Sequence, residues 1–483
     1  AEQQNPAKDN GRYIAIVGGG VSGLLAAGLL NAAGERVILL EASNRLGGRV
    51  LGCGELVPGH TFDLGAELVH GDNNIFYKLA VENNWELEKV VTWAPGDGEA
   101  LPVRDGKAFF WLGKEKVLVD SITMQQLTPV VDKKKEDDVH VIIEETERLL
   151  DALHSLEHLK GKLDPSLTLR EYLMDVVGIS HPTVLDLAEA GYGNTICCPL
   201  DAIRLNELVR IEKRFAQEGT GEFHLKNGIA RTLIPYLQRR VPKFRLNWEV
   251  KRINWSAGQP ITLTNHRNEK ITGVTHVILT PTPEQMKKIS FNPVLPLRLS
   301  QALRSFNLFP AMKLFIVFSE RIWPINSHGV ICSNSKFPEF WFSCHPEESS
   351  YVACAFATSI HAENILALGE EQAVRTMLKQ LDEMFGGATR TYVRHFLWDW
   401  SAHPHIGGGY SSTNVPWLDR KELMKPVGGR LFLAGEAAWP SYMTIIGALN
   451  SGARAANAIL EQVGKQKRDP VILEREAASR SRL

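Results

Sequence analysis

The chain has 483 residues and carries 54 Lys and Arg residues against 55 Asp and Glu residues, a formal net charge of −1. This length accommodates about three domains of average size, or two larger domains built from separate segments. Near neutrality argues against a general nucleic-acid-binding protein, because a surface that neutralises phosphates is usually strongly basic. Apolar residues make up 44% of the chain and charged residues 23%, which is typical of a folded globular protein and excludes a disordered one.

The cysteines and the apolar runs exclude further classes. The six cysteines have no C-x-x-C spacing, so we expect neither a disulfide framework nor a metal site. Such sparse use of cysteine suits a reducing compartment. In the apolar run at residues 13–30, Gly18, Gly19, Gly20 and Gly23 would interrupt a spanning helix, so we expect no membrane-spanning segment.

The first forty residues predict a strand, a helix and a second strand. Residues 13–17 are apolar and rich in β-branched side chains, as in a buried parallel strand. Residues 21–33 are rich in Leu and Ala and are followed by Gly34, and residues 36–40 form a second apolar run. This order is typical of a βαβ unit.

A G-x-G-x-x-G motif joins the first strand to the helix. Gly18 permits a tight turn, Gly20 lets the backbone approach a pyrophosphate, and Gly23 permits close packing of helix on strand. Ser22 lies inside the motif, at a helix N-terminus that attracts an anion. Glu41, at the end of the second strand, is placed to accept hydrogen bonds from a ribose. The sequence therefore predicts a dinucleotide-binding site.

Further elements follow along the chain. Residues 133–160 carry apolar side chains at helical spacing after a charged run at 133–138, which predicts an amphipathic helix with a solvated start. The remaining apolar runs predict a final helix in the last part of the chain and strands at residues 246–264, 274–280, 313–318 and 430–433.

Four segments carry a recognisable pattern. Residues 41–49 read E-A-x-x-R-x-G-G-R, and residues 63–71 read D-x-G-A-x-x-x-H-G. Residues 248–250 lie ahead of a V-I-L-T run with prolines at 277–283, and residues 435–452 contain G-E followed by G-A-x-x-S-G. In this order, and over nearly the whole chain, the segments resemble the flavin-dependent amine oxidase family, and most of all the animal-type peroxisomal polyamine oxidases.

The resemblance implies a fold and a division into domains. The fold would be an α/β FAD-binding domain, Rossmann-like and of the glutathione-reductase type, with an inserted α+β substrate-binding domain. We expect the domains and tail at these residues: FAD-binding domain, 12–80, 226–285 and 395–465; substrate-binding domain, 81–225 and 286–394; C-terminal tail, 466–483.

The resemblance also implies FAD as the cofactor. An arginine fork suits a phosphate, and a Gly-Gly pair lets the backbone pass against a flat ring. Mitochondrial monoamine oxidases carry a cysteine bound to the flavin where this chain has Gly409, so we expect FAD without a covalent bond. The residues expected to bind FAD come from the matching segments: Gly18, Gly20, Ser22, Gly23, Glu41, Gly48, Arg49, Leu64, Gly65, Val250, Trp400, Gly435, Glu436, Thr444 and Ile445.

Two residues are expected to be catalytic. Lys313 occupies the place of the family lysine that holds a water at flavin N5. His70 has the position of a histidine found in animal and yeast polyamine oxidases, where a neutral imidazole would accept a hydrogen bond from the substrate nitrogen or help to deprotonate it. From the residues alone, an exposed lysine and a structural core histidine are the competing interpretations.

The expected substrate is a small amine, oxidised by hydride transfer to flavin N5, with O2 as the acceptor that becomes hydrogen peroxide. Thr444 or Ile445 stands where many members place an aromatic residue. Animal polyamine oxidases have small hydroxyl residues there, so the resemblance points to polyamines. We expect His70, Glu67, Tyr410 and Thr444 to contact the substrate. His403 replaces the usual Asp of the W-x-x-D-P segment.

Two alternatives stay open. An L-amino-acid or other monoamine oxidase is weakened because residues 67–70 lack the arginine that clamps a carboxylate in that group. A non-catalytic scaffold flavoprotein is weakened because residues 81–225 contain no long helical hairpin insertion and Lys313 is present.

The last three residues resemble a peroxisomal targeting signal. Ser481-Arg482-Leu483 is a conservative variant of the S-K-L tripeptide that the peroxisomal import receptor reads. We therefore expect the peroxisome as the location and that receptor as a partner, with no nucleic acid and no membrane among the partners.

Overall fold

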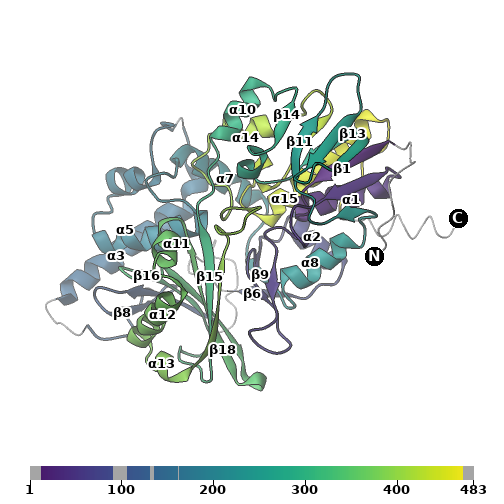
Figure 1. Cartoon of the computed structure of the whole chain (residues 1–483). Coiled ribbons are helices and arrows are strands. Elements are labelled where there is room, and N and C mark those ends of the chain that lie inside the picture. The colour runs from purple at the N-terminus through teal and green to yellow at the C-terminus, as the bar shows by residue number, and fades with distance from the viewer. Residues whose placement is uncertain (1–11, 91–105, 131–134, 162, 472–483) are drawn as a thin grey trace. The chain divides into compact units, whose positions relative to one another are not determined.

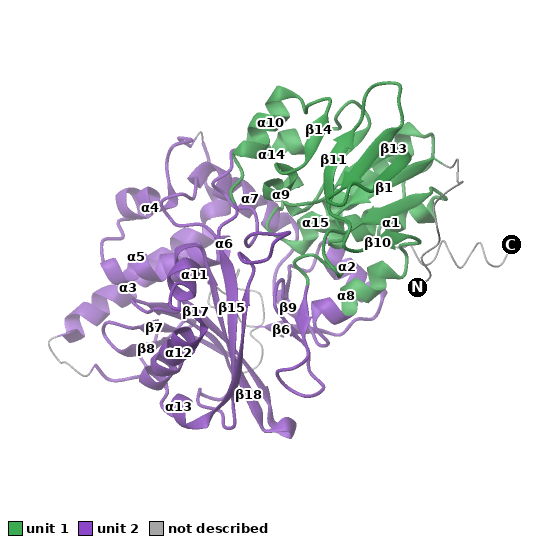
Figure 2. Ribbon diagram, in the orientation of Figure 1, with its two compact units in different colours: residues 1–50, 232–307, 417–483 green, residues 51–231, 308–416 purple. Residues whose placement is uncertain are grey.

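The computed structural model describes residues 12–90, 106–130, 135–161 and 163–471 (Figure 1). The chain divides into two compact units, each built from separate segments (Figure 2). Unit 1 contains residues 1–50, 232–307 and 417–483, and unit 2 contains residues 51–231 and 308–416.

Unit 1 is built on an eight-stranded mixed sheet. Its path runs β10-β2-β1-β13-β12-β11-β14, and β20 also pairs with β13. Strand β2 pairs in parallel with β10 and β1, and β13 pairs in parallel with β1 and β20. Strand β12 is antiparallel to both of its neighbours. The strands are β1 (Tyr13–Val17), β2 (Val37–Leu40), β10 (Phe244–Arg245), β11 (Val250–Asn254), β12 (Ile261–Asn265), β13 (Lys270–Leu279), β14 (Ser290–Asn292) and β20 (Leu431–Leu433).

Two long helices pack on the parallel strands of unit 1. Helix α1 (Val21–Ala32) contacts β1 and β2, and α15 (Ile445–Gln462) contacts β13 and α1. The other helices in this part of the chain are α8 (Ile229–Gln238), α9 (Pro283–Met286), α10 (Leu297–Arg304), α14 (Trp417–Leu423) and the short η6 (Glu436–Ala438). Helix and strand order in the first forty residues confirms the predicted βαβ unit.

Unit 2 contains a seven-stranded sheet and two smaller sheets, one of two strands and one of three. The large sheet follows the order β19-β15-β18-β17-β16-β7-β8, and only its β16–β7 pair is parallel. The strands of unit 2 are β3 (Gly52–Cys53), β4 (Phe62–Asp63), β5 (Leu68–His70), β6 (Leu87–Val90), β7 (Lys107–Leu112), β8 (Val117–Asp120), β9 (Glu222–Leu225), β15 (Ala311–Phe318), β16 (Ser327–Ser333), β17 (Glu339–His345), β18 (Ser350–Thr358) and β19 (Tyr392–Asp399).

The helices of unit 2 are mostly short. They are α2 (Ile75–Glu82), α3 (Glu136–His154), η2 (Leu156–His158), α4 (Leu169–Glu171), η3 (Tyr172–Val177), α5 (Pro182–Ala188), η4 (Glu189–Gly193), α6 (Asn194–Ile196), α7 (Leu205–Gln217), η5 (Pro346–Glu348), α11 (Ser359–Leu366), α12 (Glu370–Met384) and α13 (Ala388–Thr391). The long α3 confirms the predicted amphipathic helix and has three acidic residues in its first turn.

Strand β15 is buried along its whole length, because both of its faces are covered. Met312, Leu314 and Ile316 lie in the same core cluster as side chains of α12. Side chains alternate between the faces of a strand, so Lys313 shares the opposite face with Phe315 and Val317. That face packs against residues of the 53–64 segment.

The structure reproduces most of the predicted elements and refines others. The predicted strand at 246–264 is two strands, β11 and β12, joined by a turn at residues 255–260. All six cysteines are free thiols. No helix in the described ranges has the length and apolarity that crossing a bilayer requires.

The predicted domain boundaries differ from the boundaries of the compact units. Residues 51–80, 226–231 and 395–416 pack with unit 2, and residues 286–307 pack with unit 1. Sheet pairing explains two of these differences, because β19 pairs with β15 and β5 pairs with β9. The predicted domains were defined by role, and that assignment of roles stays a prediction.

Candidate active site

The glycine motif of unit 1 forms a turn in which side chains have no room. Gly18 has a φ of +104°, and a Cβ at this position would overlap with the hydroxyl of Thr280. A Cβ at Gly23 would overlap with the carbonyl oxygen of Gly18. Gly18 therefore requires glycine for both its conformation and its packing, and Gly23 requires it for packing alone.

The N-terminus of α1 fits a pyrophosphate. Gly20 is the N-cap residue, with no side-chain capping bond and no acidic residue in the first turn of this described helix. Gly20 forms an isolated parallel β-bridge with Gly47, and a Cβ at Gly48 would lie 3.2 Å from the Gly20 Cα. A helix start with backbone N–H groups and a glycine-lined approach is a suitable site for the diphosphate of a dinucleotide.

Glu41 holds the glycine turn in place. Its carboxylate is 8% exposed and accepts hydrogen bonds from the backbone N–H of Gly19, at 2.6 Å, and of Ser43, at 2.8 Å. The Ser43 hydroxyl donates a third bond at 2.7 Å. The predicted contact of Glu41 with a ribose stays a prediction, and the structure adds this local role to it.

The closing segment of the chain ties back to the same turn. The Gly435 N–H donates to the hydroxyl of Ser22 at 3.0 Å and to that of Ser451 at 2.9 Å. Arg49 Nη1 lies 3.0 Å from Glu436 Oε1, and the other carboxylate oxygen of Glu436 accepts from a backbone N–H at 2.9 Å. The structure therefore brings Ser22, Arg49, Gly435 and Glu436 into one hydrogen-bonded set within unit 1.

Thr444 and Ile445 start the last helix. The Thr444 hydroxyl accepts from the Gly447 N–H at 3.0 Å and donates to the Ser441 carbonyl at 2.8 Å, so its side chain caps α15. Ile445 is the buried first residue of that helix. The predicted substrate contact of Thr444 stays a prediction, but this hydroxyl already has two backbone partners.

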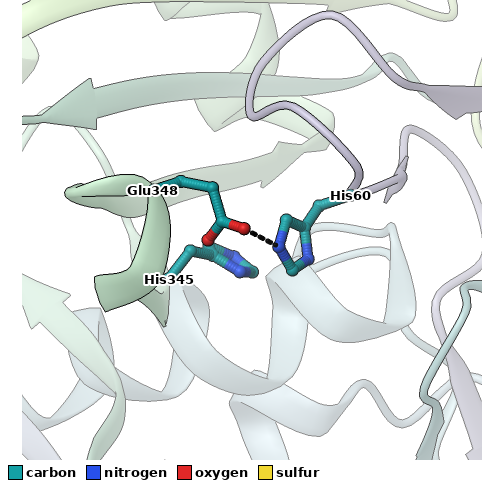
Figure 3. A group of neighbouring side chains, drawn as sticks. All are labelled: His60, His345 and Glu348. Atoms are coloured by element: carbon teal, nitrogen blue, oxygen red, sulfur yellow. Dashed lines mark ion pairs between the residues drawn. The ribbon is translucent and has the colours of Figure 1, made fainter.

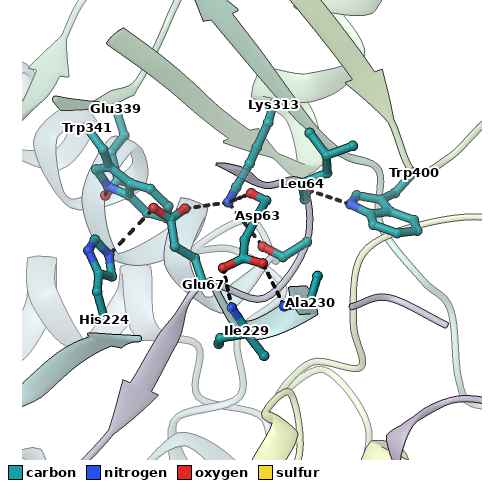
Figure 4. Close-up of polar contacts among 11 residues, drawn as sticks. Asp63, Leu64, Glu67, His224, Ile229, Ala230, Lys313, Glu339, Trp341 and Trp400 are labelled. Carbon is teal, nitrogen blue, oxygen red and sulfur yellow. Dashed lines mark hydrogen bonds and ion pairs between the residues drawn. The ribbon is translucent and has the colours of Figure 1, made fainter. Parts of the chain in front are cut away.

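Lys313 is the centre of a charged cluster in unit 2 (Figure 4). Its side chain is only 3% exposed, and Nζ donates to the carbonyl oxygens of Asp63, at 2.8 Å, and Gly65, at 3.0 Å. A third bond of 2.6 Å goes to the carboxylate of Glu67. These three acceptors match the three N–H donors of an ammonium group.

The surroundings keep Lys313 charged. Burial alone would lower the pKa of Lys313, but the charge and hydrogen bond of Glu67 and the charges of Cys354 and Asp63 together outweigh it and raise the pKa above its usual value. Nζ also lies 5.0 Å from the centre of the Trp341 ring, within the range of a cation–π contact. A water held by Nζ, as the family resemblance implies, would have to replace one of the three protein acceptors.

Glu67 has two basic partners in the structure, Lys313 and His224. Besides the bond to Lys313, its second carboxylate oxygen lies 3.5 Å from His224 Nε2. The predicted substrate contact of Glu67 stays a prediction, and the structure adds Lys313 as a partner that offsets the charge of this carboxylate. Sequence spacing gave no sign of this pairing, since the two residues are 246 positions apart.

Two more carboxylates of this cluster were not among the predicted site residues. Asp63 accepts from the N–H groups of Ile229, at 2.8 Å, and Ala230, at 3.0 Å, and so caps the start of α8. Burial raises the pKa of Asp63 to about 6. Burial likewise raises the pKa of Glu339 to about 7, although Trp341 donates a bond of 2.6 Å to its carboxylate. Asp63 had a signal in the D-x-G-A pattern, whereas Glu339 had none.

Trp400, Leu64 and Tyr410 are also placed by hydrogen bonds in unit 2. The indole N–H of Trp400 donates to the carbonyl oxygen of Leu64 at 3.0 Å (Figure 4). The Tyr410 hydroxyl donates to the Thr195 carbonyl at 2.6 Å. Val250, by contrast, lies in unit 1 as the buried first residue of β11, and the structure does not bring it into either hydrogen-bonded set described above.

His70 ends β5 and pairs with an acid on the neighbouring strand. Its Nδ1 lies 2.7 Å from a carboxylate oxygen of Glu222, the first residue of β9. Removal from water would lower the pKa of His70, but the charges of Glu222 and then Glu218 outweigh it and raise the pKa above its usual value. The predicted base therefore has an acidic partner, which orients the ring and stabilises its protonated form.

The position of Gly409 has little room for a cysteine. A Cβ there would lie 2.9 Å from the Ala311 Cβ and 3.0 Å from the Cys197 sulfur. Both distances are shorter than ordinary carbon–carbon or carbon–sulfur contact. The packing therefore agrees with the absence of a flavin-linking cysteine at this position.

Comparison with known proteins identifies the class. The model of the flavin containing amine oxidoreductases matches residues 21–460. The chain is 23% identical to the L-amino-acid oxidase of Mus musculus over 95% of this chain and 72% of that protein. It is 24% identical to the L-amino acid dehydrogenase of a Synechocystis strain over 92% of this chain and 94% of that protein.

Solved structures show the same fold. Putrescine oxidase bound to putrescine superposes with a TM-score of 0.74 at 19% identity, over 93% of this chain and 99% of that one. Cyclohexylamine oxidase from Brevibacterium oxydans IH-35A superposes with a TM-score of 0.75 at 19% identity, over 94% of this chain and 100% of that one.

The chain belongs to the family of flavin-containing amine oxidoreductases. It is an FAD-dependent enzyme that oxidises amines, and its cofactor is bound without a covalent link. The predicted fold class, an FAD-binding Rossmann-like domain with a substrate-binding domain, is confirmed. The scaffold alternative is not retained, because residues 21–460 match a family of enzymes.

Proposed function

We propose that this enzyme oxidises polyamines such as spermine, spermidine or their acetylated forms. The observation that carries the proposal is the charge around His70. The ring pairs with Glu222, Glu218 adds negative charge, and residues 63–72 contain no arginine. A substrate made of protonated amines gains free energy in acidic surroundings, whereas a carboxylate-bearing substrate loses it.

The backbone assembles these acids. The N–H of Gly71 donates to the Gly221 carbonyl at 2.8 Å, and the N–H of Asn73 donates to the Glu218 carbonyl at 2.8 Å. Asp72 accepts from the Thr220 N–H at 3.1 Å. Two segments distant in sequence are thereby joined, and the charges of Glu222 and Glu218 both act on His70. Arg214 lies 3.5 Å from Glu218 and offsets part of that charge.

The chain's own chemical task in this reaction is small. When bound, FAD would supply the acceptor for the hydride that leaves the carbon beside the amine nitrogen, and O2 would take up the two electrons and two protons as hydrogen peroxide. The protein must hold that C–H bond in line and keep the reacting amine unprotonated. His70 would accept the proton that the amine loses, and its raised pKa makes it a stronger base for this purpose. Water then hydrolyses the imine to an aldehyde and a shorter amine.

Oxidation of L-amino acids is the second candidate. The relatives at 23–25% identity favour it, since several are L-amino-acid oxidases. The same acids that favour a polycation argue against it, because a carboxylate near His70 would meet the like charges of Glu222 and Glu218.

A peroxide-release screen separates the two candidates. The purified yellow enzyme is supplied with spermine, acetylated spermine, putrescine, cyclohexylamine and leucine at equal concentrations. We expect the highest kcat/KM for a polyamine. A higher value for leucine would replace the proposal with the second candidate, and a higher value for cyclohexylamine would favour a monoamine oxidase.

The proposal extends to location. Ser481-Arg482-Leu483 lies outside the described residues, and its motif supports import into the peroxisome, where hydrogen peroxide is removed. An N-terminal fluorescent fusion should give peroxisomal puncta, and deletion of Leu483 should make the signal diffuse. Puncta that survive the deletion would argue against this address.

A further inference from the structure

Three potential metal ligands meet at one end of the large sheet of unit 2 (Figure 3). His345 is the last residue of β17, and Glu348 lies three residues later in η5, at the tip of the β17–β18 hairpin. His60 comes from the loop between β3 and β4. All three belong to unit 2, and none belongs to the Lys313 cluster or the His70 pair.

Their geometry suits a small cation. One ligand atom from each residue lies within 4.8 Å of the other two. His60 Nε2 and Glu348 Oε1 are 3.4 Å apart, and the two imidazole rings have their centres 4.1 Å apart. Tetrahedral zinc, with ligands at about 2.0–2.1 Å, separates its ligand atoms by roughly 3.3 Å. The His60–Glu348 pair already has this separation, and His345 offers a ligand atom within 4.8 Å of both.

The backbone holds these side chains on short, closed turns. The His60 N–H donates to the Val57 carbonyl at 3.1 Å. At the hairpin tip, the Ser349 N–H donates to the Pro346 carbonyl at 3.1 Å, and the Ser350 hydroxyl donates to the Glu348 carbonyl at 3.0 Å. The ligands are therefore attached to restrained backbone, which lowers the conformational cost of binding an ion.

The surroundings of His345 resemble those of a metal-binding histidine. Its Nε2 lies 3.3 Å from the Ser343 hydroxyl, and Phe62 packs edge-on against the ring at 5.5 Å. A hydrogen bond to one ring nitrogen fixes the tautomer and thereby which nitrogen offers its lone pair to a metal. Ser343 is thus placed as a positioning residue for His345.

We propose that His60, His345 and Glu348 bind one zinc ion, with water as the fourth ligand. Two imidazoles and one carboxylate are a ligand set that zinc accepts, and a set without cysteine does not favour softer ions. No metal site was expected from the sequence, because the cysteines have no C-x-x-C spacing. This site has no cysteine, and its ligands come from the two separate segments of the unit, so spacing could not reveal it.

Equilibrium dialysis of the tag-free, FAD-loaded enzyme against zinc chloride tests the proposal. We expect one zinc ion per chain, measured by elemental analysis. His60→Ala and His345→Ala should each weaken binding at least tenfold, and Glu348→Gln should weaken it as well. Ser343→Ala should weaken it by about 10- to 100-fold, the usual effect of losing a partner of a ligand.

Matched controls separate this site from adventitious surface binding. Glu347→Gln removes an exposed neighbouring acid of the same hairpin, and His158→Ala removes a histidine whose side chain is 73% exposed. Both should leave zinc binding unchanged. Glu348→Gln is a mild surface change that keeps the test valid if an alanine variant does not fold. Wild-type enzyme that binds no zinc, or binding that the His60 and His345 variants leave unchanged, would overturn the proposal.

Discussion

The glycine turn of unit 1 and the Lys313 cluster of unit 2 place functional groups in opposite ways. The turn depends on side chains that are missing, because any Cβ at Gly18 or Gly23 would overlap with neighbouring atoms. The cluster depends on charges that are present and matched, with Lys313 held by three acceptors. Packing space constrains the first region and electrostatics constrains the second. Substitutions in the two regions should therefore destabilise the protein for different reasons.

Gly23→Ala gives the largest expected effect and tests the turn. Alanine favours helices by about 1 kcal/mol over glycine, yet here its methyl group would overlap with the Gly18 carbonyl. We expect a net loss of more than about 3 kcal/mol in unfolding free energy and little bound FAD. Flavin absorbance per chain and thermal unfolding measure both. Gly54→Ala is the control, because a Cβ there meets nothing within 4 Å. Equal flavin content in the two variants would contradict the steric account.

Lys313→Met tests the charged cluster. It removes the cation that Glu67 faces and leaves two carbonyl oxygens without their donor. Since Glu67 is partly exposed, we expect the lower end of the usual penalty for breaking a buried pair, about 3 kcal/mol in unfolding free energy.

A double variant and a kinetic measurement complete this test. Lys313→Met combined with Glu67→Gln should recover part of the loss, because no unpaired charge is left. The family resemblance further predicts slower anaerobic flavin reduction by substrate in Lys313→Met. An unfolding free energy within about 0.5 kcal/mol of wild type would remove the pair from the account.

Glu339→Gln tests whether Glu339 belongs to the electrostatic region, through the pH dependence of the unfolding free energy. Burial raises the pKa of Glu339 to about 7. A raised pKa in the folded state means that protonation stabilises the fold below the ordinary carboxyl pKa, and this stabilisation is lost as pH rises through 7. The unfolding free energy of wild type, relative to Glu339→Gln, should therefore fall by about 2 kcal/mol between pH 5 and pH 7. Parallel pH curves for the two proteins would contradict the raised pKa.

His70→Ala and Glu222→Gln test the edge of this region, where the smallest effect on stability is expected. The pair is partly exposed, so it contributes little to folding. Its effect should appear in the pH profile of kcat/KM. Loss of the Glu222 charge should lower the pKa of His70 and move its limb to lower pH, and His70→Ala should remove that limb. Identical profiles for all three enzymes would exclude His70 from the reaction.

The same contrast explains what the sequence could predict. The turn and its βαβ unit lie within residues 13–41, and glycine spacing, strand ends and one acid suffice to identify them. The strand that carries Lys313 was also predicted, because a strand buried on both faces is a continuous apolar run.

The partners in unit 2 could not be predicted in this way. Lys313 meets Glu67, His70 meets Glu222, and Asp63 meets the start of α8 only because sheets and turns bring distant segments together. No periodicity encodes such pairings. The sequence therefore identified several of the individual residues, but it gave no sign of the pairing of Glu67 with Lys313 or of the buried carboxyl group of Glu339.

Anaerobic titration of the bound flavin tests the central claim most directly, because it separates reaction with the substrate from reaction with O2. Spermine or its acetylated form should bleach the yellow enzyme completely, and admission of O2 should restore the colour with release of hydrogen peroxide. Leucine should bleach it far more slowly. An enzyme that leucine bleaches and polyamines do not would contradict the proposed substrate class.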